Sequence, residues 1–129
     1  MCACRQWRAL AAEVGDAMAV ELASSGVNLS FAQVVDLDTN PANPVIGPRA
    51  FAAAVDEVTD AARRFSAAMH AAGVWTCLKH FPGHGDTSVD SHEALPSLDL
   101  DLDTLRRREL APYRALAAAA PMIMTAHIL

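Results

Sequence analysis

Long apolar runs and clustered basic side chains are both scarce in this sequence of 129 residues. The longest apolar stretch, residues 115–124, is too short to span a bilayer and is interrupted by Pro121. The beginning of the sequence lacks the apolar run of a signal peptide. Basic side chains are scattered apart from residues 106–108, and the formal net charge is -5, which argues against binding to phosphate backbones. We therefore expect a cytoplasmic protein that binds neither membranes nor nucleic acid.

Cysteine is also scarce, with three residues at positions 2, 4 and 77. Cys2 and Cys4 are too close together for the C-x-x-C clip of a zinc site, and an odd set of cysteines is most simply explained by a reducing compartment. The sequence has neither a Gly-x-Gly-x-x-Gly nor a P-loop pattern. It therefore predicts no redox or nucleotide cofactor.

The residues that are present favour a packed core. The hydrophobic content is 53% and the charged content 19%, as in one small globular domain or one piece of a larger domain. Apolar periodicity predicts helices at residues 7–25, 51–72 and from about 101, and strands at residues 27–35, 74–78 and 121–125. Pro112 is expected to kink or restart the last helix. This alternation indicates an α/β fold with a parallel sheet whose apolar strands are buried.

Turn-forming and polar residues gather in two segments, each of which follows a predicted strand. Residues 39–49 contain three prolines and a glycine, and residues 79–97 carry three of the five histidines. The ends of parallel strands form the edge at which α/β proteins bind ligands. The sequence therefore predicts a functional site built from these two segments.

Several polar residues of these segments allow more than one interpretation. His80 and His84 have the spacing of zinc ligands on a helix, but Pro82 and Gly83 prevent a helix here, so we predict no metal site and a structural role for His84. Asp90 and His92 form either an exposed surface pair or an acid/base pair. Arg49 either binds a ligand or pairs with an acid such as Asp36 or Asp38, and Lys79 either binds a ligand or extends from the rim.

Residues 79–87 (KHFPGHGDT), continuing through Asp90-Ser91-His92 to Leu95-Pro96, resemble the signature loop of family 3 glycoside hydrolases. More narrowly, they resemble the bacterial β-N-acetylhexosaminidases. Residues 26–32, 35–38, 43–47, 49–51 and 124–127 match further family segments in the same order. Gln33 departs from the family, which usually has proline at this place. The resemblance covers residues 11–129, as the middle portion of an N-terminal (β/α) barrel domain, whereas residues 1–10 match poorly.

This resemblance implies a TIM-type barrel that hydrolyses terminal β-linked N-acetylglucosamine with retention of configuration. The implied substrate is a glycan or muropeptide that contains N-acetylglucosamine, as in peptidoglycan recycling, and the chemistry needs only water. By the same resemblance, His92 acts as general acid/base and Asp90 orients it, because a histidine can both give and accept a proton near neutrality. Arg49, Lys79 and His80 are implied to bind the sugar hydroxyls.

Other features argue for an incomplete barrel. The family places its nucleophilic aspartate on a later strand, beyond the position of Leu129, and a complete barrel needs about 250 residues. We therefore expect a truncated hydrolase that lacks its nucleophile and self-associates through open barrel edges. Two alternatives remain open, namely a non-catalytic sugar-binding or interaction module that keeps the ligand-binding residues, and a degraded gene product.

Overall fold

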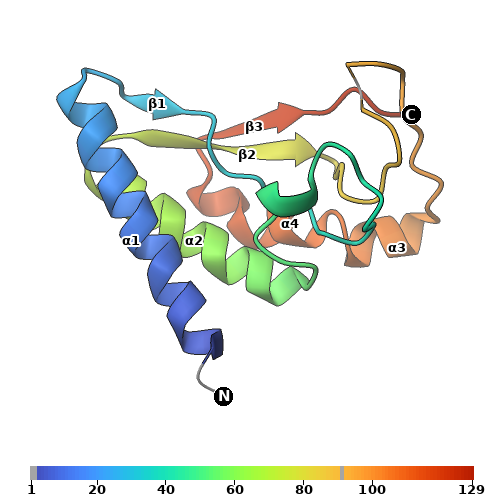
Figure 1. Ribbon diagram of the computed structural model, residues 1–129, viewed down its shortest axis with the longest axis horizontal. Coiled ribbons are helices and arrows are strands. Elements are labelled where there is room, and N and C mark those ends of the chain that lie inside the picture. Colours follow the sequence, from blue (N-terminus) through green and yellow to red (C-terminus); the bar gives the residue numbers. More distant parts are fainter. Residues whose placement is uncertain (1–2, 91) are drawn as a thin grey trace.

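The computed structural model describes residues 3–90 and 92–129 (Figure 1). Its elements are α1 (Ala3–Ser24), β1 (Leu29–Ser30), η1 (Gly47–Arg49), α2 (Val55–Ala71), β2 (Trp75–Phe81), α3 (Leu102–Arg107), α4 (Ala111–Leu116), η2 (Ala117–Ala119) and β3 (Met122–Thr125). Helices and strands alternate along the chain, which confirms the predicted α/β class. In the described ranges, none of the helices has the length and apolar character needed to cross a membrane.

The three strands form one parallel sheet in the order β1-β2-β3. Leu29 lies opposite Trp75 in the first pair, and Cys77 lies opposite Met122 in the second. Figure 1 shows α1, α2 and α4 together on one side of this sheet. All three strands point toward the same edge, which we call the carboxyl edge, and the chain there forms a first loop (residues 39–49) and a second loop (residues 82–101).

Two apolar clusters join the helices to the sheet. The first joins Val35 and Leu37 to α2, β2 and α4, and the second joins Phe65 and Met69 to Ala19 of α1 and to Val74. Burying these side chains is the main force that holds the helices against the sheet. The core therefore lies on the helix-covered side of the sheet and packs beneath the residues of the carboxyl edge, such as Val35 and Leu37.

The helix boundaries differ from the predicted ones mainly at the start of α2. The prediction placed Phe51 in this helix, but α2 begins at Val55, and the preceding Ala54 has an extended backbone. The ring of Phe51 folds back to 6.4 Å from that of Phe65 while keeping 37% of its surface exposed. The prediction that Phe51 belongs to this helix and to its buried apolar stripe is therefore wrong, although its spacing fits the apolar periodicity of the sequence. The predicted stop at Gly73 is confirmed by its positive φ of 79°, and Pro112 does restart the chain as α4.

The strands also differ from the prediction in length and burial. β1 has only two residues, because the hydroxyl of Ser30 accepts a hydrogen bond from the amide of Ala32 and interrupts the ladder, which resumes as a single bridge between Val34 and Lys79. β2 continues to Phe81, so Lys79 and His80 belong to a strand and not to a loop. The prediction that β3 is buried is wrong, since Met122 and Ile123 are 36% and 46% exposed.

Candidate functional site

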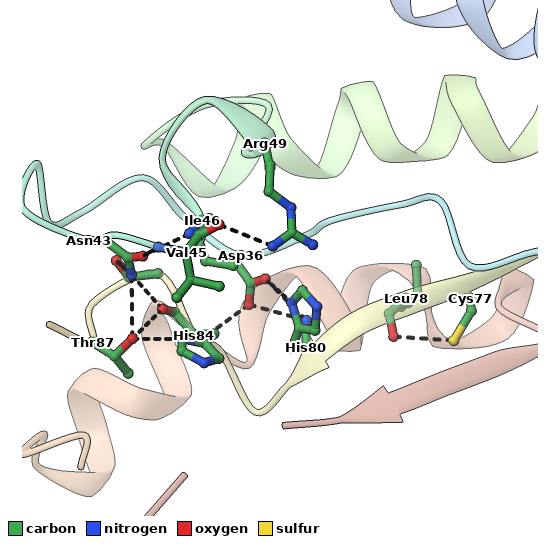
Figure 2. A network of polar contacts seen from close by, with 11 residues as sticks. Asp36, Asn43, Val45, Ile46, Arg49, Cys77, Leu78, His80, His84 and Thr87 are labelled. Carbon is green, nitrogen blue, oxygen red and sulfur yellow. Dashed lines mark hydrogen bonds and ion pairs between the residues drawn. The ribbon is translucent and has the colours of Figure 1, made fainter. Parts of the chain in front are cut away.

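The candidate site lies at the carboxyl edge, where the last residues of β2 meet the first and second loops (Figure 2). Asp36 lies at its centre and is completely buried. One oxygen of its carboxylate accepts a hydrogen bond of 2.7 Å from the amide of His84, and the other lies 2.7 Å from Nδ1 of His80. The amide of His80 is shared between both oxygens at 3.2 Å. These contacts satisfy the buried carboxylate and join the segment after β1 to the end of β2.

The predicted ligand-binding residues Arg49, Lys79 and His80 approach this centre from two directions. Lys79 and His80 come from β2, and Arg49 ends η1 in the first loop. Nη1 of Arg49 donates a 3.0 Å hydrogen bond to the carbonyl of Val45, and no ion pair between Arg49 and Asp36 or Asp38 occurs within the described ranges. Burial lowers the pKa of Lys79, and the nearby positive charge of Arg49 lowers it further. Two cationic groups therefore lie close enough to influence each other beside a buried acid.

Asn43 ties the first loop to the second. Its Nδ2 donates to the carbonyls of His84 and Gly85 at 2.8 and 3.0 Å, and its Oδ1 accepts the amides of Val45 and Ile46 at 2.8 and 2.7 Å. Only 8% of this residue is exposed, so water does not compete strongly for these bonds. A single side chain therefore holds the two loops together, although Asn43 and His84 are 41 residues apart in sequence.

His84 has the structural role that the sequence predicted. It is only 2% exposed, and its Nδ1 lies 2.6 Å from the hydroxyl of Thr87, which in turn donates a 3.0 Å hydrogen bond to the carbonyl of His84. Because that hydroxyl has a single hydrogen, this arrangement makes Nδ1 of His84 the donor in the shorter contact. The imidazole thereby closes the turn from inside the molecule.

The turn between α3 and α4 supports the second loop from its other side. Arg108 donates from Nη2 to Asp86 at 2.7 Å and from Nε to Glu109 at 2.6 Å. The Glu109 side chain is buried against the Cα of Gly83, where an added Cβ would come within 2.8 Å of the Glu109 Cβ. Burial raises the pKa of the Glu109 carboxyl, which favours its neutral form. The base of the second loop is therefore held by Asn43 on one side and by this pair on the other.

Asp90 and His92 lie farther along the second loop, and among the described residues their two side chains form no hydrogen bond or ion pair with each other. The amide of His92 donates a 2.9 Å hydrogen bond to Oδ1 of Asp90, and His92 is exposed. Ser91, between them, lies outside the described residues. The carboxylate therefore orders the backbone that carries the imidazole, whereas the predicted orientation of the ring by Asp90 stays a prediction.

Sequence reasoning missed Asp36 as a partner of His80, and it also missed Asn43 and Glu109. Asp36 had a detectable signal, because a charged residue between the apolar Val35 and Leu37 at the end of a strand is unusual. The contacts by which Asn43 and Glu109 reach the second loop could not be predicted, since His84, Gly85 and Gly83 are distant from them in sequence. In the part of the chain that the structure describes, no group of three histidine, cysteine, aspartate or glutamate side chains is arranged to hold a metal ion.

Comparison with known sequences gives consistent matches over almost the whole chain. The model of the family described as "Glycosyl hydrolase family 3 N terminal domain" matches residues 2–129. "Beta-hexosaminidase A" of Pseudoalteromonas piscicida is 48% identical over 120 residues, which are 92% of this chain and 20% of that protein. "Beta-hexosaminidase" of Methylococcus capsulatus is 46% identical over 122 residues, 94% of this chain and 36% of the relative. The chain therefore spans between a fifth and roughly a third of these relatives.

Solved structures agree with the sequence matches. A family 3 β-N-acetylglucosaminidase from Paenibacillus superposes with a TM-score of 0.91 at 41% identity, covering 95% of this chain and 23% of that one. NagZ from Neisseria gonorrhoeae, in complex with N-trifluoroacetyl-D-glucosamine, superposes with a TM-score of 0.88 at 37% identity, over 95% of this chain and 36% of that chain. The three-stranded sheet and its helices thus have the arrangement of part of these larger proteins.

Proposed function

Since the chain belongs to glycosyl hydrolase family 3, as part of its N-terminal domain, we propose that it forms the sugar-binding half of a β-N-acetylhexosaminidase site. The observation that carries this proposal is the placement of Lys79 and His80 at the end of β2, beside Arg49 and around the buried Asp36. The proposed reaction is retaining hydrolysis of terminal β-linked N-acetylglucosamine, and it belongs to the whole protein, because the matched relatives are much longer than this chain.

The roles follow from the chemistry of each side chain. Arg49 and Lys79 present N–H donors to sugar oxygens, and His80 contributes a ring nitrogen. His92 is the proposed general acid/base, since imidazole transfers protons in both directions near neutral pH. Asp90 is proposed to orient His92, and its bond to the His92 amide supports this, because it restricts the backbone on which the ring is carried. The bound sugar is proposed to be N-acetylglucosamine of a glycan or muropeptide.

Lys79 offers a direct test of sugar binding, because it is the only lysine in the sequence. Its lowered pKa gives it more of the reactive neutral amine near neutral pH than an ordinary lysine has. We expect N-acetylglucosamine to slow acylation of Lys79, measured by mass spectrometry of the peptide that contains it. The α-amino group of the same molecule serves as the internal reference, and its acylation rate should stay constant.

The controls separate sugar binding from general crowding. Mannitol at equal concentration should leave the Lys79 rate unchanged, and Arg49→Ala should weaken the protection about tenfold or more, since a hydrogen bond to a charged group contributes about 1.5–3 kcal/mol. Arg64→Ala, which removes an exposed guanidinium in α2, should keep the protection. Equal Lys79 labelling with and without N-acetylglucosamine would contradict the proposed function.

We also propose that copies of this chain associate through the sheet face opposite to α1 and α2. Parallel sheets are normally buried on both faces, and among the described residues the helices cover only one (Figure 1). Trp75 of β2 and Met122 of β3 are 58% and 36% exposed, and Phe31 after β1 is 53% exposed. This uncovered apolar face, together with the open edges at β1 and β3, favours association with another chain.

Sedimentation velocity tests this association. The chain is expected to form dimers or larger species as its concentration rises, and Trp75→Lys should shift it toward the monomer because a charge would be buried in the contact. Val20→Lys is the matched control, since Val20 is 65% exposed on α1 and lies in the helical layer. A wild-type chain that stays monomeric at every concentration would refute the association.

A further inference from the structure

We infer that Asp36 is a positioning residue that holds the His80 ring in its Nδ1–H tautomer and so makes Nε2 a hydrogen-bond acceptor for a ligand hydroxyl. The tautomer follows from contacts within the chain alone. The statement about the ligand rests on the proposed function, since it takes the bound molecule to be a sugar.

The carboxylate of Asp36 is buried, so solvent water cannot replace its partners within the chain. Its side chain is 0% exposed, and that of His80 is 18% exposed. Asp36 lies between Val35 and Leu37, whose side chains belong to the apolar core. The shared hydrogen bonds from the His80 amide fix the backbone at the same carboxylate that meets the ring (Figure 2). If the ring turned away, the carboxylate oxygen that meets Nδ1 would keep only the longer, shared hydrogen bond from the His80 amide, which is costly for a buried charge.

The direction of the ring contact is decided by the chemistry of the two groups. An ionised carboxylate only accepts hydrogen bonds, so Nδ1 of His80, at 2.7 Å, must donate. In a neutral imidazole one nitrogen carries the hydrogen and the other has a free lone pair. Because Nδ1 carries it, Nε2 is left as an acceptor on a side chain that is partly exposed.

This assignment distinguishes between classes of ligand. Lys79 and Arg49 donate hydrogen bonds, and the His80 ring in its neutral form adds an acceptor beside them. A sugar suits this set, because each hydroxyl offers an oxygen to a cationic group and a hydrogen to Nε2. A carboxylate such as acetate offers only acceptors and would place a lone pair against the lone pair of Nε2. The acceptor at Nε2 therefore favours a ligand that brings a hydroxyl hydrogen, as a sugar does, over one that offers only acceptors.

Long-range ¹H–¹⁵N NMR of the imidazole nitrogens tests the inference above the titration range of the rings. In the wild-type chain we expect His80 to show a protonated Nδ1 and an unprotonated Nε2, with its signals assigned by their loss in His80→Gln. Asp36→Asn should invert this pattern. Asparagine has one acceptor oxygen, which the His84 amide requires, so its NH₂ group would face Nδ1 and donate to it.

Asp38→Asn is the matched control, because it removes the same charge from an exposed position two residues away and should leave the tautomer unchanged. A wild-type His80 with its hydrogen on Nε2, or a folded Asp36→Asn chain that keeps the Nδ1–H form, would overturn the inference. The wild-type measurement decides the matter even where Asp36→Asn fails to fold.

Addition of N-acetylglucosamine to the same sample separates this inference from the proposed function. A bound hydroxyl should shift the Nε2 resonance of His80, whereas acetate at equal ionic strength should shift it much less. An Nδ1–H tautomer together with no response to the sugar would support the role of Asp36 and contradict the proposed function. A sugar response from a ring with its hydrogen on Nε2 would support the proposed function and contradict the role of Asp36.

Discussion

Gly85→Ala is expected to destabilise the fold by about 4 kcal/mol or more, which is a large part of the stability of a small domain. An added Cβ at this position would penetrate the carbonyl oxygen of Leu37 and lie 2.8 Å from its carbonyl carbon. These are backbone atoms next to the buried core, so no side-chain rotation can relieve the overlap. The expected measurement is a strongly lowered urea midpoint, or loss of the cooperative transition.

Gly73→Ala provides the matched control. Gly73 has a positive φ of 79° and open space around the position of a Cβ, so its substitution tests backbone strain alone. We expect a cost of about 1 kcal/mol, typical of a non-glycine residue in the left-handed region. If Gly85→Ala unfolded at the same urea concentration as Gly73→Ala, the close approach of residues 37 and 85 would be incorrect.

Asn43→Ala is expected to have the second largest effect, a loss of about 3 kcal/mol. The substitution removes four short hydrogen bonds and leaves the carbonyls of His84 and Gly85 and the amides of Val45 and Ile46 without their partner. Buried groups that lose their partners cost more than the bond itself contributes. Chemical denaturation measures the total loss, and amide hydrogen exchange should show faster opening of both loops.

Asn40→Ala is the graded comparison for Asn43→Ala. Nδ2 of Asn40 donates to the carbonyl of Thr87 at 3.1 Å, but this contact is only partly buried, so we expect a loss of about 1 kcal/mol. Asn28→Ala, at an exposed position, should change little. If the two loops exchanged at the wild-type rate in Asn43→Ala, Asn43 would not be the link between them. Loss of sugar protection at Lys79 in the same variant is expected, because Arg49 ends the loop that Asn43 holds.

These effects concern the precision of the site as much as the stability of the fold. The proposed ligand-binding groups come from β2 and from the first loop, and the proposed acid/base comes from the second loop. Three buried residues hold these parts together: Asp36 contacts His80, Asn43 bonds the second loop, and Glu109 packs against Gly83. A rigid base with an exposed outer part, as at His92, is the arrangement expected where a loop must admit a sugar and then position a proton donor.

Much of the fold and part of the site follow from local sequence. Apolar spacing within one helix or strand, and the turns at Gly73 and Pro112, depend on neighbouring residues only, so the order of elements and the parallel sheet were predicted correctly. The dense polar run of residues 79–92 identified the glycosidase family, which the comparisons confirm. The structural role of His84 was predictable in the same way, because Pro82 and Gly83 restrict its turn.

Tertiary structure alone decided which acid meets His80, which residue links the loops, and which strand stays exposed. The sequence marks Asp36 as an unusual charged residue between two apolar ones, but only the fold brings the amide and ring of His80, 44 residues later, to its carboxylate. β3 is as apolar as a buried strand, yet its exposure depends on what packs over it. Hydrogen bonds and burial between distant segments are set by the geometry of the whole chain, and residue spacing along the sequence carries no information about that geometry.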